Sequence, residues 1–390
     1  MSERNLDFDT IIERRGTDCI KYDMASQYGY PEDILPLWVA DMDFKTSSYV
    51  EDAVIERTKN GVFGYSEASE AYFEALHGWL ERHHNWNIRK EWCVRTPGVV
   101  FALATAVKAY TNPGDRVLIQ QPVYYPFSNM ITRNGREVVS NDLILEGTSY
   151  RIDFDDFENK IVENDIKLFI LCNPHNPVSK VHSREELEKL GDICLKHGVT
   201  VVSDEIHSDF DYNGKHTVFA TVKEEFENIC IVCTAASKTF NLATMTVSNI
   251  IIPDAGLRTK FEEAKAATGA SQLPVLGLVA TQAAYEHGEE WYNAMISYVK
   301  GNIEYVKEYV KNNMKGVQVI EMEGTYLMWL DFRGTGIPWE ELDRRIVNDA
   351  KVWLDSGSLF GKTGEGFQRI NVAAPRKIIE ECMKRLKSVI

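Results

Sequence analysis

Three polar residues in the middle of the chain could do chemistry together. Asn176, Asp204 and Lys238 each follow, within five residues, the end of a short apolar run. Such runs are typical of buried strands, and ligands of open α/β sheets bind at the carboxyl ends of the strands. Each residue alone has an ordinary interpretation, because a lysine in such a loop is usually solvated and an aspartate at a strand end is often a helix N-cap. Together they predict an amine, a carboxylate and an amide at one edge of a sheet.

These three groups are the ones that pyridoxal 5′-phosphate requires from a protein. Its aldehyde must form an imine with an amine, for which Lys238 is placed. Its ring nitrogen must stay protonated to accept electrons, and a buried carboxylate such as Asp204 favours the charged form. Its phenolic oxygen takes a neutral donor such as the amide of Asn176, and its phosphate takes the N–H groups at a helix start. We therefore expect a Schiff base on Lys238 and amino-acid substrates.

The elements that must position these residues alternate between strand and helix. Apolar runs of five or six residues lie at 116–120, 167–172, 199–203 and 229–233, with longer amphipathic stretches between them. One such stretch opens with a capping box from Ser183 to Glu186 and closes at Gly198, which predicts a helix. Strand, helix and strand at this spacing indicate parallel pairing through right-handed crossovers, in an α/β sheet covered on both faces.

A second unit is expected after Pro253. A chain of 390 residues favours two domains. Patterns predict mostly helix over 256–315, a strand over 323–331, a helix over 338–350 and a closing helix from about 376. We expect one long helix to join the two domains.

Composition limits the classes of partner. Hydrophobic residues make up 44% and charged residues 26%, with a formal net charge of −15, which argues against nucleic acid and membrane surfaces as partners. The first residues are polar and no apolar run approaches a membrane span, so we expect a cytoplasmic protein.

Cysteine usage points the same way. Seven cysteines are an odd number, which favours reduced thiols over a disulfide framework. Cys230 and Cys233 have the spacing of a redox motif, but they lie in one apolar run, and side chains three apart on a strand point to opposite faces. We interpret both as packing residues, and we assign no metal ligands.

Five ordered blocks resemble the class I/II aminotransferase superfamily. They are Leu37-Trp38-Val39-Ala40-Asp41-Met42-Asp43-Phe44, Asn173-Pro174-His175-Asn176-Pro177-Val178, Asp204-Glu205-Ile206-His207, Ser237-Lys238-Thr239-Phe240-Asn241 and Phe367-Gln368-Arg369-Ile370-Asn371. The first two blocks are most similar to the MalY/PatB-type cystathionine β-lyases, which are carbon–sulfur lyases. The resemblance runs from about residue 7 to the C-terminus.

This resemblance implies a fold and an assembly. The fold would be the PLP-dependent transferase fold type I, an α/β fold with a mainly parallel seven-stranded sheet between helices and a smaller α/β C-terminal domain. We expect an N-terminal segment at 1–48 packing with the small domain, a large cofactor-binding domain at 49–285 and a small domain at 286–390. A homodimer with shared active sites is implied, and a regulatory protein partner stays open.

The resemblance also assigns roles to residues around the cofactor. Lys238 would be the Schiff-base lysine and the base that moves protons, and Asp204 would pair with the ring nitrogen. Asn176, alone or together with His207, would hydrogen-bond the phenolic oxygen, and His207 stands where transaminases usually have a tyrosine. Tyr124 would stack on the cofactor ring.

Further roles concern the phosphate and the substrate. The phosphate would lie on Gly98, Val99 and Val100, at the start of a helix running to about Tyr110. Ser237 would add a hydroxyl, and Tyr65 would reach the phosphate from the other subunit. Arg369 would form the two-bond contact with the substrate α-carboxylate that only a guanidinium offers. Ala40 and Tyr65 complete the expected substrate contacts.

Three positions depart from the family pattern. Ser179 stands where relatives usually have a glycine after Asn-Pro-x, and Thr244 replaces a glycine in the lysine loop. Thr246, eight residues past the lysine, replaces a basic residue that many members place against the phosphate. We therefore expect weaker charge compensation at the phosphate and a lower affinity for the cofactor.

The reaction implied is α,β-elimination, in which the deprotonated substrate expels a thiolate from Cβ and leaves pyruvate and ammonia. Cystathionine would yield homocysteine. An aminotransferase shares the early steps, and residue types alone do not decide between elimination and transfer, nor do they identify the preferred sulfur amino acid. A purely binding or regulatory protein is disfavoured, because it has no use for Lys238, Asp204, Asn176 and Arg369 together.

Overall fold

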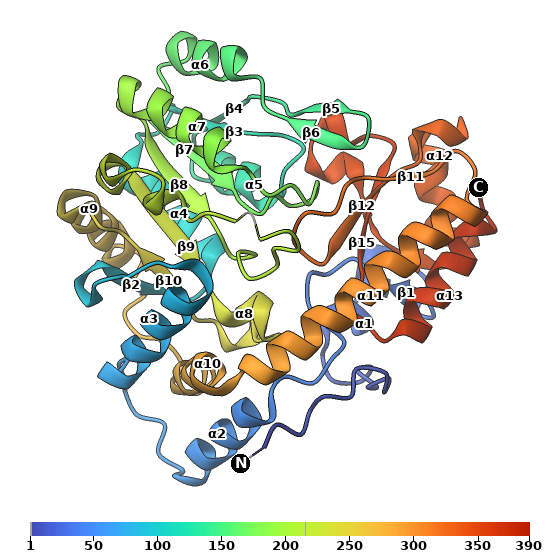
Figure 1. The fold of residues 1–390 in the computed structure, drawn as a ribbon, viewed down its shortest axis with the longest axis horizontal. Helices are drawn as coiled ribbons and strands as arrows, with labels where there is room; N and C mark the ends of the chain where they lie inside the picture. The colour runs from blue at the N-terminus through green and yellow to red at the C-terminus, as the bar shows by residue number, and fades with distance from the viewer. Residues whose placement is uncertain (1, 215) are drawn as a thin grey trace.

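A seven-stranded sheet forms the centre of the larger part of the molecule (Figure 1). The computed structural model describes residues 2–214 and 216–390. The strand order is β2-β10-β9-β8-β7-β3-β4, and the pairs from β9 to β4 are parallel, whereas β10 runs antiparallel to both of its neighbours. These strands are β2 Cys93–Thr96, β3 Arg116–Ile119, β4 Glu137–Ser140, β7 Leu168–Cys172, β8 Thr200–Asp204, β9 Cys230–Thr234 and β10 Ser248–Ile251. The predicted α/β fold with a mainly parallel seven-stranded sheet is confirmed.

Helices cover this sheet on both faces (Figure 1). The helices up to residue 287 are α1 Ile20–Asp23, α2 Ser48–Lys59, α3 Glu70–His84, α4 Val99–Tyr110, α5 Pro126–Arg133, α6 Phe154–Glu163, α7 Arg184–His197, α8 Ala236–Thr239, α9 Ala255–Ala266 and α10 Val275–His287. The capping box predicted for α7 is present, with Ser183 and Glu186 bonding reciprocally and Gly198 ending the helix in the left-handed conformation. A short hairpin of β5 Ile144–Glu146 and β6 Ser149–Arg151 lies outside the sheet.

A smaller antiparallel sheet of order β11-β12-β15-β14 lies beside the first (Figure 1). Its strands are β11 Gln318–Val319, β12 Leu327–Asp331, β14 Asp355–Ser356 and β15 Phe367–Asn371. The helices of this part are α11 Glu289–Asn313, α12 Trp339–Arg344 and α13 Arg376–Lys387. The long helix expected between the two parts is α11, with 25 residues. The limits of the domains stay a prediction.

Two predicted elements differ in detail. The strand expected over 323–331 begins only at Leu327, because Thr325 takes a left-handed φ of 60° and Gly324 bridges to Asp211 instead. The helix expected over 338–350 is α-helical to Arg344 and then widens into a π-turn that ends at Asp349. Both differences are local distortions that hydrophobic spacing does not reveal.

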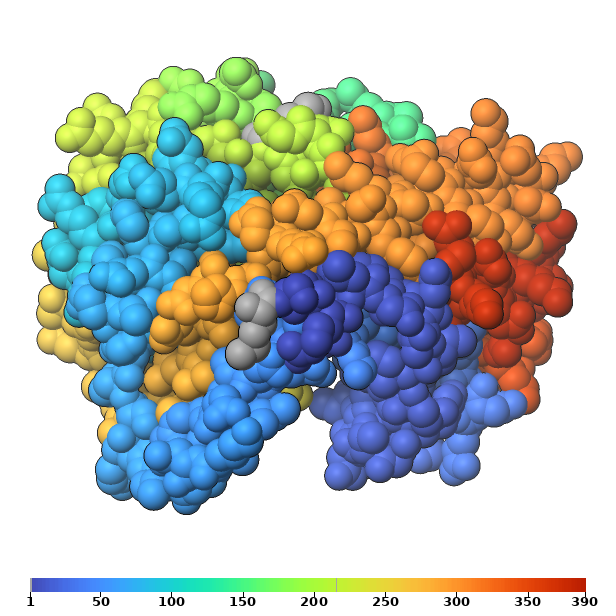
Figure 2. All heavy atoms as spheres, turned by 60° about the horizontal axis from the view of Figure 1, so that its bottom comes forward, coloured from blue at the N-terminus to red at the C-terminus, as the bar shows by residue number. Residues whose placement is uncertain are grey.

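The N-terminal residues pack along α11 (Figure 2). Phe8 contacts Trp291 and Tyr298, with ring centroids 5.9 and 5.5 Å apart. Further on, β1 (Leu35–Pro36) pairs in parallel with β13 (Val352–Trp353). The N-terminal segment therefore contacts elements from the last hundred residues of the chain.

The core lies on both sides of the main sheet. Cys230 belongs to the apolar cluster on one face and Cys233 to the cluster on the other, which confirms the predicted packing role. Both are free thiols. Within the described residues, no helix combines the length and apolarity needed to cross a membrane.

Candidate active site

A cavity of about 220 Å³ opens at the carboxyl ends of β7 and β8. Its walls contain most of the residues predicted for the site: Ala40, Gly98, Val99, Val100, Tyr124, Asn176, Asp204, His207, Ser237 and Lys238. Arg369 is linked to this set through a hydrogen bond with Asn176. Tyr65 lies elsewhere, on a separate surface pocket with Phe63 and Leu273.

Lys238 presents its amine to the cavity from the one-turn helix α8. Its Nζ donates to the carbonyl oxygen of Ala40 at 2.7 Å. Burial lowers the pKa of this amine to about 8, with a further decrease from the positive charge of Arg369, while Asp41 and Asp204 oppose the shift. A lysine with this pKa is neutral in a substantial fraction of molecules near pH 8, so it can act as a nucleophile and as a base.

Asp204 is the last residue of β8 and is only 4% exposed. Burial raises the pKa of its carboxyl to about 7, although the N–H of Ile206, 3.2 Å from Oδ1, and the charge of Lys238 lower it. A carboxylate held away from water in this way favours a neighbouring cation. This environment fits the charged ring nitrogen of pyridoxal phosphate.

Arg369, from β15, is buried against three oxygen acceptors. It donates to Oδ1 of Asn176 at 2.9 Å and to the carbonyl of Trp38 at 2.7 Å, and it forms an ion pair with Asp355. Because Arg369 occupies the amide oxygen of Asn176, the NH₂ group of that amide is its donor toward the cavity. A substrate carboxylate at Arg369 has to compete with Asp355.

Sequence reasoning missed Asp355. Burial raises the pKa of its carboxyl, and Arg369 opposes that shift. The sequence signal at Asp355 was weak, because a single acidic residue directly after an apolar run, here 352–354, is also what an ordinary N-cap or surface carboxylate shows.

His207 is held neutral. Burial lowers the pKa of its imidazole well below the ordinary value, and the charges of Lys238 and Arg369 add to the effect. Its Nδ1 is buried and has no hydrogen-bond partner among residues 2–214 and 216–390. A buried nitrogen of this kind is suited to a polar ligand group, as the predicted contact with the phenolic oxygen requires.

The start of α4 forms another wall of the cavity. Gly98 has a φ of 136°, and a Cβ added there would meet no atom within 4 Å, so the backbone is open to the cavity. The first N–H groups of a helix have no acceptor within the helix, and the helix dipole favours an anion there. The N–H groups of Val99 and Val100 therefore fit a phosphate.

The segment 37–44 contacts Lys238 through the carbonyl of Ala40. The carbonyl of Ala40 also accepts from the hydroxyl of Tyr326 at 2.9 Å. Asn371 donates to the carbonyls of Val39 and Asp41, both at 2.6 Å, and so fixes the peptide groups around Ala40. Sequence reasoning placed Asn371 in a motif but gave it no role.

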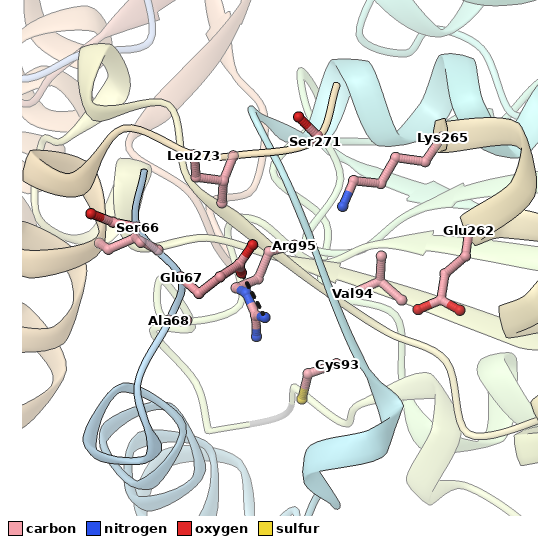
Figure 3. Close-up of a pocket in the computed structure, with 11 residues that line it drawn as sticks. Ser66, Glu67, Ala68, Cys93, Val94, Arg95, Glu262, Lys265, Ser271 and Leu273 are labelled. Carbon is pink, nitrogen blue, oxygen red and sulfur yellow. Dashed lines mark ion pairs between the residues drawn. The ribbon is translucent and has the colours of Figure 1, made fainter. Parts of the chain in front are cut away.

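A second pocket, of about 130 Å³, is built from other residues and lies near β2 and α9 (Figure 3). It contains the ion pair of Arg95 with Glu67, 3.9 Å apart, and Lys265. Burial lowers the pKa of Lys265 and the charge of Arg95 adds to this effect, as Arg369 does for Lys238. Lys265 therefore offers a comparison lysine away from the predicted site.

Two of the three departures from the family pattern, Ser179 and Thr246, have left-handed backbone conformations. Ser179 adopts a left-handed φ of 60°, the conformation that favours glycine, and its hydroxyl donates to the carbonyl of Leu327 at 2.6 Å. Thr246 is also left-handed, with a φ of 49°, and both Thr244 and Thr246 are exposed. A β-branched residue is strained in this conformation.

We expect Thr246→Lys to strengthen retention of the cofactor, because a cation there adds charge compensation for the phosphate. The rate at which pyridoxal phosphate is lost during dialysis measures retention, and we expect this loss to be about tenfold slower in Thr246→Lys than in wild type. Thr246→Asn is the matched control, since asparagine tolerates the left-handed backbone without adding charge. Equal retention in wild type and Thr246→Lys contradicts the idea.

Comparison with known proteins gives the family of the chain. The model of the family described as "Aminotransferase class I and II" matches residues 32–386. The chain belongs to this family. It is 40% identical over 386 residues to a cystathionine beta-lyase, PatB, of Bacillus subtilis, covering 99% of this chain and all of that protein. It is 30% identical to the protein MalY of Escherichia coli, covering 98% of both chains.

Solved structures agree on the fold. Cystalysin from Treponema denticola, whose crystal structure contains a pyridoxal 5′-phosphate cofactor, superposes with a TM-score of 0.95. It is 36% identical to this chain, and the match covers 98% of each. The resemblance to the lyase branch of the class I and II aminotransferases is confirmed over nearly the whole chain.

Proposed function

We propose that this chain is a pyridoxal 5′-phosphate-dependent carbon–sulfur β-lyase. It cleaves L-cystathionine and related cysteine S-conjugates by α,β-elimination to a thiol, which is homocysteine for cystathionine, with pyruvate and ammonia. The observation that supports this most is the cavity in which the amine of Lys238 and the carboxyl of Asp204 both have shifted pKa values. The full-length similarity to a cystathionine β-lyase, PatB, supports the substrate class.

The chain's own residues divide the work. Pyridoxal phosphate, when bound, supplies an aldehyde that captures amines and a ring that accepts electrons released at the substrate α-carbon. The amine of Lys238 would remove the proton from that carbon, and the carboxylate of Asp204 would stabilise the positive charge on the ring nitrogen. Asn176 and His207 donate hydrogen bonds from a buried wall, and Val99, Val100 and Ser237 bind the phosphate.

The remaining residues orient the substrate. Arg369 would bind the α-carboxylate in place of its contact with Asp355. Tyr124, which lines the cavity, would pack its ring against the ring of the cofactor. Burial raises the pKa of the Tyr124 hydroxyl, so the ring stays uncharged. The Ala40 carbonyl accepts a hydrogen bond from the Lys238 amine at 2.7 Å and so fixes the position of that amine in the cofactor-free protein.

The second candidate is an aminotransferase, favoured by the family model that matches residues 32–386. One assay separates the two. Purified protein loaded with pyridoxal phosphate is incubated with cystathionine, with and without 2-oxoglutarate, and pyruvate and thiol are measured. We expect equal amounts of pyruvate and thiol without 2-oxoglutarate. Turnover that requires the oxo acid contradicts the lyase proposal and supports the aminotransferase.

We also propose the finer features of the assembly. Two copies share their active sites, with Tyr65, which is 93% exposed in the single chain, reaching the phosphate of the other copy. The N-terminal segment ends near residue 48 and the large domain near residue 285. The free thiols at Cys19, Cys93 and the buried cysteines suit the reducing cytoplasm.

A further inference from the structure

The helix that presents Lys238 is too short to fix its own orientation. α8 has four residues, Ala236–Thr239, and no side chain caps its N-terminus at Ala235. A single helical turn is marginal by itself, since nucleation fixes several backbone dihedrals for one hydrogen bond. The direction of the Lys238 side chain must therefore come from neighbours that hold this turn.

The two residues after Lys238 supply such anchors. The hydroxyl of Thr239 donates to Oδ2 of Asp209. The ring of Phe240 is fully buried and contacts Trp79 and Trp291, with centroids 5.2 and 5.9 Å apart. The Thr239 anchor is polar and directional and lies on the last residue of α8, whereas Phe240 packs without direction and Asn241, beyond the helix, donates to the carbonyls of Met42 and Phe44. The contact with Asp209 is therefore a directional hold on the turn itself.

Asp209 is itself held by several elements. Its side chain is 8% exposed, and its Oδ1 accepts from Nε1 of Trp79 at 3.1 Å and lies 2.8 Å from Nε2 of His84, both from α3. Its backbone carbonyl accepts from the hydroxyl of Tyr292, on α11, at 2.6 Å. Burial raises the pKa of the carboxyl, but His84 and Thr239 hold it below the ordinary value. An ionised carboxylate with this many donors is a rigid acceptor.

We propose that Asp209 is a positioning residue that holds Lys238 in its reactive place through Thr239. This inference rests on the proposed function, because it assigns Lys238 the reacting amine. Asp209 does not touch the cavity, and it acts by fixing the turn that directs the amine toward Ala40 and the cavity. Misplacement of a reacting group by about 1 Å can lower a rate by as much as about 100-fold.

Two substitutions at Thr239 test the proposal. Thr239→Val has the same shape but no hydroxyl, and Thr239→Ser keeps the hydroxyl. In cofactor-free protein, acetic anhydride labels Lys238, and mass spectrometry of its peptide gives the labelling rate against pH. We expect the midpoint of that profile to move about one pH unit toward that of an exposed lysine in Thr239→Val, and to stay unchanged in Thr239→Ser.

The loaded enzyme gives the second readout. We expect kcat with cystathionine to decrease about tenfold in Thr239→Val with little change in KM, and to recover in Thr239→Ser. Asp209→Asn should move both readouts in the same direction as Thr239→Val. Thr111→Val is the matched control, because it removes a buried hydroxyl that accepts from Nε of Arg136 at 2.9 Å, at the end of α4 remote from the cavity. It should lower thermal stability and leave the Lys238 profile unchanged.

The outcomes separate this inference from the proposed function. A shifted labelling profile in Thr239→Val supports the positioning role even if no lyase activity is found, because labelling needs neither cofactor nor turnover. A wild-type profile in Thr239→Val, or an equal shift in Thr111→Val, overturns the positioning role, whatever the activity assay gives.

Discussion

Lys238→Ala is expected to abolish lyase turnover, with a decrease in kcat on the order of 10⁴-fold or more. The reason is that one amine has two tasks, capture of the cofactor aldehyde and removal of the α-proton. Burial lowers the pKa of this amine to about 8, so it is prepared for both tasks near neutral pH. Pyruvate release from cystathionine measures the loss. The visible absorption of the lysine–cofactor bond should disappear as well.

Lys265→Ala is the matched control. Burial lowers the pKa of Lys265 too, but it lines the second pocket and lies outside the predicted site (Figure 3). We expect Lys265→Ala to keep the visible absorption and a kcat within about twofold of wild type. Unchanged turnover in Lys238→Ala, or equal losses in both variants, would remove Lys238 from the mechanism and with it the proposed function.

The central strands could be predicted because their sequence and their environment agree. Each of the runs around Phe169, Val201 and Ile231 is apolar at successive positions, as a sheet covered on both faces requires, and the strands begin or end within a residue of the prediction. The placement of Asn176, Asp204 and Lys238 followed from the same regularity, because parallel strands end at one edge.

The residues that act through other residues could not be predicted. Asp355 meets Arg369, and Asn371 holds Ala40, only because separate parts of the chain pack together. Asp209 sits two residues past His207 in a polar run, where a surface carboxylate is the ordinary interpretation. Spacing along a sequence reports the local element, whereas these partners are fixed by tertiary contacts.

Asp204→Asn is expected to decrease kcat on the order of 10²- to 10³-fold and to weaken cofactor retention. The amide keeps the shape of the side chain but cannot balance a positive ring nitrogen, and breaking a buried charge pair costs about 3–5 kcal/mol. Steady-state kinetics with cystathionine and cofactor release on dialysis measure the two effects. Wild-type values for both would contradict the role of Asp204.

The same substitution should stabilise the cofactor-free protein, with a pH dependence that identifies the cause. Burial raises the pKa of Asp204 to about 7 in the folded state, from 3.8 for the ordinary group. A carboxyl with a raised folded pKa loses stability as the pH rises from about 4 to 7, because ionisation is easier in the unfolded chain. Asp204→Asn removes that loss, so its thermal midpoint should match that of wild type near pH 4 and lie above it at pH 8. At pH 8 its free energy of unfolding should exceed that of wild type by at most about 4 kcal/mol.

The comparison needs a second acid with a raised pKa outside the predicted site, and Asp343 is such an acid, half-buried in the small domain. Asp343 also has a pKa raised by burial, and it accepts hydrogen bonds from Ser356 and Gln368. Asp343→Asn should have a smaller stability gain at high pH and leave kcat near wild type. If Asp204→Asn instead destabilises the cofactor-free protein at pH 8, the buried carboxylate is already satisfied by its own protein neighbours. In that case it exerts no preference for a cationic ring, because the desolvation that favours such a partner has been compensated within the fold.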